Sequence, residues 1–140
     1  MTQPPTPIDI STFPQLEALC RQIIATFPRG IFHLHGDLGS GKTTFVQTLL
    51  RQLGYTGIVN SPTYALVQEY ELGPRHIIHS DLYRLQEPEE LLYLDVRDWP
   101  SRADYIFIEW PERGGDLLPP ATARLHFQLQ GTKRFLRLER

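Results

Sequence analysis

The stretch IFHLHGDLGSGKTTFVQTLLRQL, residues 31–53, decides the fold, because it joins a short apolar run to a glycine-rich loop and an amphipathic segment. The apolar run at residues 31–35 predicts a short strand. After Lys42, apolar residues recur at helical spacing, which predicts a helix that ends at Gly54. A strand, a glycine-rich turn and a helix in this order indicate an α/β layer fold.

The glycine-rich loop, residues 36–43, satisfies the pattern G-x-x-x-x-G-K-[ST]. Its glycines allow successive backbone N–H groups to curl around phosphate oxygens, and the following helix directs its positive end at the same anion. Lys42 can reach the β- and γ-phosphates of a nucleotide, and the Thr43 hydroxyl can ligate Mg²⁺. The pattern therefore predicts a nucleotide phosphate site, made by Gly39, Ser40, Gly41, Lys42, Thr43 and Thr44.

Upstream of this unit, the sequence predicts a flexible leader over residues 1–10 and then one amphipathic helix. Thr12 and Gln15 have the spacing of a capping box, and Pro14 is tolerated in a first helical turn. One apolar helix face follows, made by Leu16, Leu19, Cys20, Ile23, Ile24 and Phe27. The place of Cys20 on that face indicates a core side chain rather than a nucleophile.

Downstream of the loop, strand patterns dominate. The expected strands are residues 64–70, 76–79, 105–108, 123–130 and 134–138, with a short helix after Pro88. The last two strands form a hairpin around Gly131. Together these elements predict a single α/β domain over residues 1–140 with three layers: a P-loop NTPase-type sheet with a mostly parallel centre, antiparallel strands and flanking helices.

Composition narrows the function classes. The chain has 140 residues, of which 41% are hydrophobic, and this is enough to build one core. Its formal net charge of -2 disfavours a domain that wraps nucleic acid by itself, so we expect no DNA partner. The sequence has one cysteine, no membrane-length apolar run and no secretory signal, so we expect a cytoplasmic protein without a membrane partner.

Two acidic residues end predicted strands and are candidates for the chemistry of the site. Asp81 follows the strand at residues 76–79, and Glu109 follows the strand at residues 105–108. Sheets of this class bind ligands at the carboxyl ends of their strands, so both acids should lie near the phosphate loop. One acid would support Mg²⁺ and the other would orient or deprotonate water, and the spacing leaves both assignments open.

Four motifs occur in a fixed order along the chain: GDLGSGKTT at residues 36–44, SPTYALV at 61–67, HSDLYRL at 79–85 and IEWPE at 108–112. In this respect the sequence resembles the bacterial tRNA threonylcarbamoyladenosine biosynthesis ATPase family, TsaE. The first motif is generic to nucleotide hydrolases, whereas the other three together are specific to the family. The resemblance covers about residues 12–138.

The resemblance implies a role for each matching residue. Thr43 and Glu109 would hold Mg²⁺, Asp81 would activate water, and Trp110 would shape the site around the nucleotide. Lys42 would act with them on the phosphates.

Further roles follow from the same resemblance. Ser61, Pro62 and Thr63 would form a mobile switch-like segment close to the γ-phosphate. Lys133 would contact the nucleotide, and the segment around Ser11 and Thr12 would lie by the adenine.

The resemblance also implies a function. The chain would bind Mg-ATP, with Mg²⁺ as its cofactor, and hydrolyse it slowly. Binding and hydrolysis would recruit it to the TsaB–TsaD complex and reset that complex, which transfers threonylcarbamoyl to the adenosine beside the anticodon. Contact with tRNA would be indirect, through the complex.

Two other functions stay open. A small-molecule kinase would need an arginine-bearing lid, for which Arg97 and Arg102 are the nearby candidates. A non-catalytic nucleotide sensor would need only binding. A GTPase is disfavoured because the sequence has no Asn-Lys-x-Asp motif for reading guanine.

Several other residues carry weaker signals. His33 and His35 favour an ordinary strand pair over a zinc site, and His79 could contact the active site through its nearness to Asp81. The tyrosines favour sheet packing over RNA stacking; they are Tyr64, Tyr70, Tyr83 and Tyr93. The C-terminal basic residues favour a solvated hairpin face over an RNA or acidic partner; they are Arg124, Lys133, Arg134, Arg137 and Arg140. Residues 95–102 depart from the family pattern.

Overall fold

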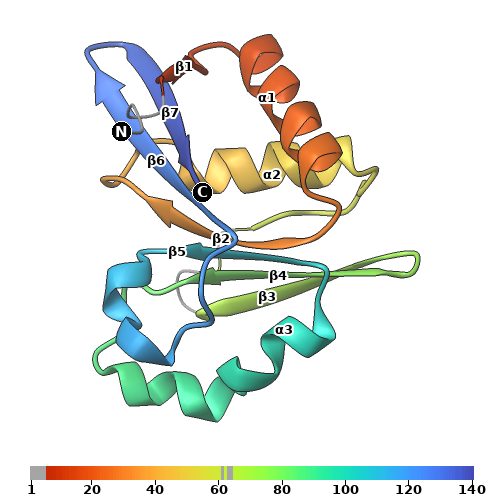
Figure 1. Ribbon diagram of the computed structural model, residues 1–140, viewed down its shortest axis with the longest axis vertical. Helices are drawn as coiled ribbons and strands as arrows, with labels where there is room; N and C mark the ends of the chain where they lie inside the picture. The colour runs from red at the N-terminus through yellow and green to blue at the C-terminus, as the bar shows by residue number, and fades with distance from the viewer. Residues whose placement is uncertain (1–5, 61, 63–64) are drawn as a thin grey trace.

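A mixed sheet with helices on both faces forms the described part of the chain, which is residues 6–60, 62 and 65–140 of a computed structural model (Figure 1). Its strand order is β1-β7-β6-β2-β5-β4-β3. The strands are β1 (Ile8–Asp9), β2 (Gly30–His35), β3 (Val67–Leu72), β4 (Arg75–Asp81), β5 (Tyr105–Glu109), β6 (Ala123–Gln130) and β7 (Lys133–Glu139). The central neighbours β6, β2, β5 and β4 pair in parallel, and the outer strands pair antiparallel, so the predicted fold class is confirmed.

The two faces of the sheet carry different kinds of helix (Figure 1). α1 (Phe13–Thr26) and α2 (Lys42–Gln52) cover one face. The other face is covered by short elements, which are η1 (Pro88–Leu94), η2 (Val96–Asp98), α3 (Trp99–Arg102), η3 (Pro111–Arg113) and η4 (Gly115–Leu117). Within the described ranges, none of these helices has the length and apolar character that crossing a membrane requires.

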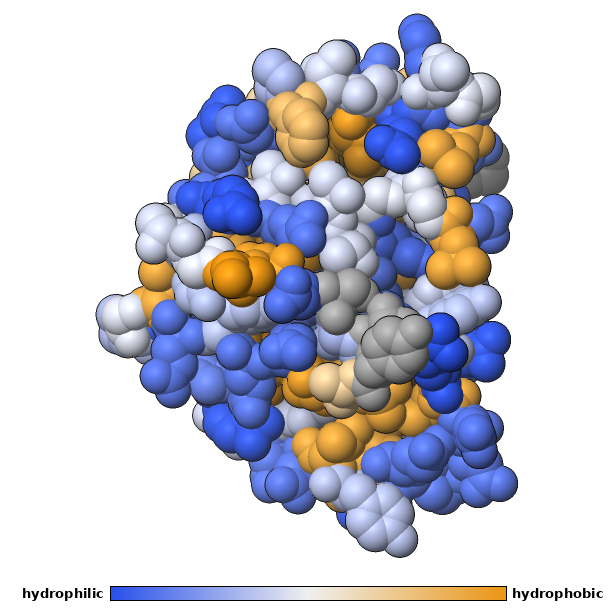
Figure 2. All heavy atoms as spheres, turned by 180° about the vertical axis from the view of Figure 1, so that it is seen from behind, coloured by the Kyte–Doolittle hydropathy of each residue, from blue (hydrophilic) through white to orange (hydrophobic). Residues whose placement is uncertain are grey.

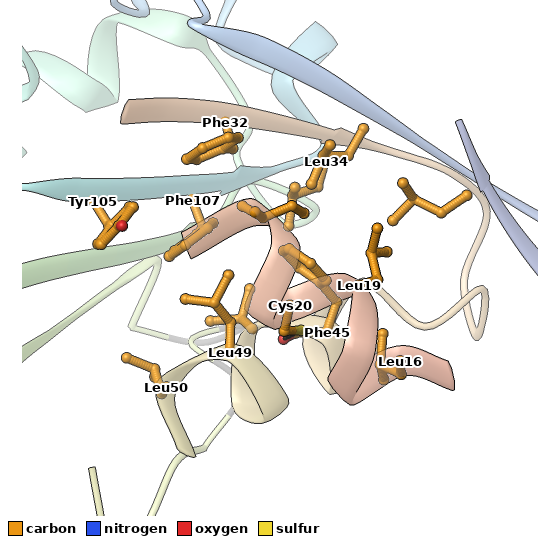
Figure 3. Packing of buried hydrophobic residues seen from close by; sticks show 14 of the residues in the cluster. Leu16, Leu19, Cys20, Phe32, Leu34, Phe45, Leu49, Leu50, Tyr105 and Phe107 are labelled. Carbon is orange, nitrogen blue, oxygen red and sulfur yellow. Dashed lines mark hydrogen bonds between the residues drawn. The ribbon is translucent and has the colours of Figure 1, made fainter. Parts of the chain in front are cut away.

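Each face of the sheet has its own buried cluster. On the α1/α2 face, aromatic residues of β2 and β5 pack against both helices, and Cys20 is fully buried among them as predicted (Figure 3). On the other face, Ile106 and Ile108 pack with Trp99, which donates its Nε1–H to the carbonyl of Leu94 at 2.9 Å. All five residues of β5 are buried, because both of its faces are covered.

The segment before α1 corrects one prediction. Thr12 caps α1 with the expected capping box to Gln15. However, Ile8–Asp9 forms strand β1 against the edge of β7, and Ile10 is buried. A flexible leader over residues 1–10 is therefore wrong for residues 8–10. The prolines at positions 4, 5 and 7 dominate the composition there, but the apolar Ile8 and Ile10 can still extend a sheet with an open edge.

Strand β3 starts later than the sequence indicates. The alternation predicted a strand from residue 64, whereas β3 begins at Val67 and runs to Leu72. Leu66 has a φ of 66°, a left-handed conformation that interrupts an extended strand.

The face turned away in Figure 1 is mostly polar, with an apolar area in its lower half (Figure 2). That half holds η1, the green helix at the lower edge of Figure 1. Two side chains of η1 are exposed, Leu92 at 42% and Tyr93 at 90%.

Candidate nucleotide site

The phosphate loop connects β2 to α2 through three glycines with positive φ. The φ angles are 152° at Gly36, 76° at Gly39 and 107° at Gly41. Residues other than glycine rarely adopt positive φ angles of this kind. At Gly36, a Cβ atom would also lie 2.9 Å from the carbonyl oxygen of Phe127. The glycines of the motif are therefore required by backbone shape and, at Gly36, by lack of space.

Lys42 lies buried at the start of α2 and has two neighbours of different kinds. Its Nζ donates a hydrogen bond to the carbonyl of Gly36 and lies 3.8 Å from the ring centroid of Trp110. Burial lowers the pKa of Lys42, whereas the carboxylates of Glu109 and Asp81 act in the opposite direction. Trp110 follows β5 directly with a φ of 57°, and its ring lies over the Lys42 ammonium group.

The two candidate acids come from adjacent strands. Asp81 and Glu109 are register partners in the parallel pair β4–β5, so the ladder itself sets them side by side. The Thr43 hydroxyl donates to Glu109, at 2.9 Å from Oε2 and 3.1 Å from Oε1. Asp81 Oδ1 accepts a bond from the backbone N–H of Tyr83 at 3.0 Å. The contact between Thr43 and Glu109 favours Glu109 as the acid on the metal side.

The donor set at this position fits Mg²⁺. A hydroxyl and a carboxylate are hard oxygen donors, which Mg²⁺ prefers, and magnesium at phosphate sites takes only one or two protein ligands beside phosphate and water. The described residues contain no cluster of three or more His, Cys, Asp or Glu side chains that could hold a metal ion.

One hollow of about 300 Å³ brings most of the predicted residues together. Its lining consists of Leu38, Gly39, Gly41, Lys42, Thr43, Thr44, Asp81, Glu109, Trp110 and Arg134. Ser40 is buried and lines the larger hollow on the other side of the loop.

Lys133, which was expected to contact the nucleotide, is absent from this lining, whereas its neighbour Arg134 is part of it. Arg134 donates from Nη2 to the carbonyl of Gly39 at 3.4 Å, and its backbone N–H donates to the Ser11 hydroxyl at 2.9 Å. Successive residues of a strand point to opposite faces, so only one of the two side chains can face the loop. The alternation of β7, with buried Leu136 on the α1 side, was the signal that could have identified Arg134.

A smaller hollow of about 60 Å³ adjoins the first. It is lined by Ile10, Ser11, Thr12, Phe13, Leu16, Gly41, Thr44 and Arg134, and the last three of these line both hollows. The segment around Ser11 and Thr12 thus lies next to the phosphate loop.

The predicted switch-like segment is described only at Pro62, because Ser61 and Thr63 lie outside the described residues. Pro62 is buried, and its carbonyl accepts a hydrogen bond from the N–H of Leu66. The carbonyl of Leu66 in turn accepts bonds from the Ser80 hydroxyl and the Asp81 N–H, at 2.9 and 3.0 Å. The end of this segment is therefore fastened to the strand that carries Asp81.

The histidines have separate surroundings. His33 is buried with Nε2 3.0 Å from the carbonyl oxygen of Pro119, and burial lowers the pKa of its ring. His35 stacks on His126 with ring centroids 4.9 Å apart. His79 does contact the site, because its Nε2 lies 2.5 Å from Glu109 Oε2.

Of the tyrosines singled out in the sequence, those that the structure describes either pack against other aromatic rings or lie on the surface. Tyr70 packs edge-on against Tyr55, and Tyr83 packs against Trp110. Tyr93 is exposed on η1, so the packing prediction is wrong for it, since η1 turns this side chain away from the sheet. Tyr64 lies outside the described residues.

The other arginines that the sequence singled out do not line the nucleotide pocket. Arg97 and Arg102 are exposed and do not line it, and Arg102 pairs with Glu69 at 3.2 Å. Of the C-terminal basic residues, only Arg134 reaches the pocket lining.

A larger hollow of about 520 Å³ lies on the opposite side of the loop and includes His35, Ser40 and His126. Its permanently charged lining residues are Asp37 and Arg137, one of each sign. Unlike the 300 Å³ hollow, it contains neither strand-end acid nor Lys42, so the 300 Å³ hollow is the candidate for the nucleotide chemistry.

A strand, a glycine-rich loop, a helix and two strand-end acids define the P-loop NTPase class of fold. A solved structure with this architecture, entitled "Crystal structure of Bacillus subtilus YdiB", superposes with a TM-score of 0.71 over 99% of this chain and 88% of that chain. Its sequence identity is 22%, so this similarity concerns the fold.

Residues 10–137 match the family model described as "Threonylcarbamoyl adenosine biosynthesis protein TsaE". The chain belongs to the TsaE family.

Curated relatives named "tRNA threonylcarbamoyladenosine biosynthesis protein TsaE" agree with this membership. The Haemophilus influenzae relative is 47% identical over 89 residues, which are 64% of this chain and 56% of that protein. The Bacillus subtilis relative is 38% identical over 66% of this chain and 57% of that protein. The Rickettsia typhi relative is 33% identical over 81% of this chain and 79% of that protein. The chain thus spans little more than half the length of the first two.

Proposed function

We propose that this protein is an ATPase that supports the threonylcarbamoyladenosine modification of tRNA. It would bind Mg-ATP, hydrolyse it slowly, and use binding and hydrolysis to engage and reset the TsaB–TsaD complex. The observation that carries the proposal is the convergence of Lys42, Thr43, Asp81 and Glu109 on one hollow in a TsaE-family chain.

Binding would be dominated by the phosphates. The backbone N–H groups of the loop and the start of α2 attract the anion, and the buried Lys42 ammonium lies beside them. Thr43 and Glu109 would hold Mg²⁺, which when bound offsets charge on the β- and γ-phosphates. The base would enter the hollow beside Ser11 and Thr12.

Hydrolysis would depend on Asp81. Its carboxylate would orient a water molecule in line with the γ-phosphate and accept a proton as the water oxygen bonds to phosphorus. The bond from phosphorus to the β,γ-bridging oxygen would break, which releases ADP and inorganic phosphate. Lys42 and the loop amides would offset the charge that builds up on the transferring group.

We expect slow turnover by the isolated protein from the residues that line the pocket. Arg134 is the arginine in that lining, and its side chain lies against Gly39 on the loop. Without a second arginine over the γ-phosphate, we expect low activity that a partner raises.

The test is ATP hydrolysis with Mg²⁺, measured for the protein alone and after addition of the TsaB–TsaD complex. The Lys42→Ala variant is the blank. Slow basal turnover that rises with the complex would support the proposal. ATP binding without any response to the complex would contradict the role in tRNA modification.

A nucleotide sensor without catalysis is the alternative that the same site permits. The Asp81→Ala variant separates the two functions, because it should bind Mg-ATP while losing hydrolysis. Full tRNA modification in cells that carry Asp81→Ala would favour the sensor and contradict a need for hydrolysis.

Arg134 should contribute to nucleotide binding, in contrast to Lys133. We expect Arg134→Ala to weaken ATP binding by about 10-fold, since a charge-assisted contact contributes about 1.5 kcal/mol. Lys133→Ala, on the opposite face of β7, should leave the affinity unchanged. Calorimetric titration of both variants measures this, and equal losses would contradict the assignment.

A further inference from the structure

We propose that His79 is a positioning residue that holds the Glu109 carboxylate in place for Mg²⁺. This inference rests on the proposed function, because it concerns the same metal site. His79 does not line the nucleotide pocket, so any effect that it has must act through Glu109.

The strand register places His79 directly behind the site. His79 lies two residues before Asp81 on β4, and Glu109 lies two residues after Phe107, the register partner of His79, on β5. Side chains two residues apart on a strand share a face, so His79, Asp81 and Glu109 all point to the α2 side. His79 is fully buried at the boundary between the core and the pocket.

The direction of the hydrogen bond follows from the acceptor. A carboxylate has no proton to donate, so the proton between the two groups is assigned to Nε2 of His79, 2.5 Å from Glu109 Oε2. Within residues 6–60, 62 and 65–140, the second ring nitrogen, Nδ1, has no hydrogen-bond partner. A buried imidazole with one nitrogen unpaired has a cost in stability, so its single bond indicates a specific task.

That task is to keep Glu109 away from Lys42. The two side chains attract each other across the pocket, and a direct ion pair would occupy both the metal carboxylate and the phosphate-binding ammonium. The bond from His79 fixes Oε2 from the core side. Glu109 then stays beside Thr43, and Lys42 keeps its contacts with the Gly36 carbonyl and the Trp110 ring instead of pairing with Glu109.

The test compares two amide substitutions that preserve polarity but differ in reach. Glutamine can place its amide N–H near the position of Nε2, whereas asparagine is shorter and cannot reach Glu109. His33 provides the matched control, because it is also buried and also uses Nε2, to the carbonyl of Pro119 on a neighbouring part of the sheet. The four variants are His79→Gln, His79→Asn, His33→Gln and His33→Asn.

Binding of a non-hydrolysable ATP analogue is measured by calorimetry while Mg²⁺ is varied, and again in EDTA. We expect His79→Asn to raise the Mg²⁺ concentration at half-maximal tightening by about 10- to 100-fold, the usual effect of losing a partner of a metal ligand. His79→Gln should restore most of the shift. Affinity in EDTA should stay as in the wild type, and neither His33 variant should move the Mg²⁺ midpoint.

An unchanged midpoint in His79→Asn would overturn the inference, as would an equal loss of affinity in EDTA. If His79→Asn does not fold, His79→Met replaces it, because methionine fills the space without a donor. Wild-type protein that binds the analogue with no dependence on Mg²⁺ would overturn the proposed metal site itself, and with it the proposed function. A normal wild type with unaffected His79 variants would overturn only the role of His79.

Discussion

Gly36 has less space around it than the other two glycines of the phosphate loop, Gly39 and Gly41. It combines a positive φ with close contact to β6, where an added Cβ would lie 2.9 Å from the carbonyl oxygen of Phe127 and 2.7 Å from Oγ of Ser40. Gly39 also has a positive φ, but an added Cβ would meet nothing within 4 Å. Substituting Gly36 and Gly39 in turn therefore distinguishes the cost of backbone strain from the cost of a steric clash.

We expect Gly36→Ala to lower the free energy of unfolding by about 3 kcal/mol, from the left-handed backbone plus overpacking. Gly39→Ala should lower it by only about 1 kcal/mol, because it has the backbone cost alone. Urea unfolding without nucleotide measures both. Equal losses would show that the contact with Phe127 relaxes freely.

Helix α1 shows how an element can be defined by local sequence. Its Thr12 side chain accepts a hydrogen bond from the Gln15 N–H at 3.3 Å, and Gln15 Oε1 accepts one from the Thr12 N–H at 3.0 Å. This capping box fixes the start of the helix beside the smaller hollow. The end of α1 has no basic residue in its last turn, so the cap is its main local signal.

Removal of this cap should cost about 1 kcal/mol of stability. For a chain of this size, Thr12→Ala should lower Tm by about 3–4 °C in the absence of nucleotide. Thr56→Ala is the control, since Thr56 is exposed and lies outside the helices and strands of the described chain. A similar fall in both variants would argue against a capping role.

Elements with a strong local pattern could be predicted from the sequence, and elements that depend on a distant partner could not. α1, α2 and the hairpin of β6 and β7 have periodicity, caps or turn residues of their own. Strand β1 has only two residues and exists because β7 offers an open edge. Its pairing is a tertiary event that no local pattern encodes.

The residues of the site also divide into those with a local sequence pattern and those that depend on a distant partner. The phosphate loop and the strand-end acids were recognisable because their chemistry fixes their spacing, and apart from Ser40 the predicted loop residues line one hollow together with both acids. Arg134 was missed because the choice between it and Lys133 depends on which face of β7 meets the loop. The precise partner of His79 also depended on the register between β4 and β5.

The molecule as a whole has one cysteine, and that residue reports on global unfolding. Cys20 is fully buried between α1 and α2, and burial raises the pKa of its thiol to about 12. In the unfolded chain the thiol has an ordinary pKa of about 8.5. Above that pH the unfolded state binds fewer protons than the folded state, so stability falls as pH rises.

We expect a disulfide reagent such as Ellman's reagent to modify native Cys20 very slowly at pH 8 and rapidly in denaturant. Raising the pH from 8 to 10 should lower the stability of the wild type more than that of Cys20→Ala, which lacks the thiol. Fast labelling of the native protein would contradict the burial of Cys20.

The ladder between β4 and β5 has a practical consequence for anyone who wishes to re-engineer this chain. Asp81 and Glu109 keep their separation because the strands pair, whatever the length of the connection at residues 82–104. A reporter peptide grafted beside the exposed Tyr93 would lengthen that connection without altering the spacing of the two acids. The same graft within the phosphate loop would have no such protection.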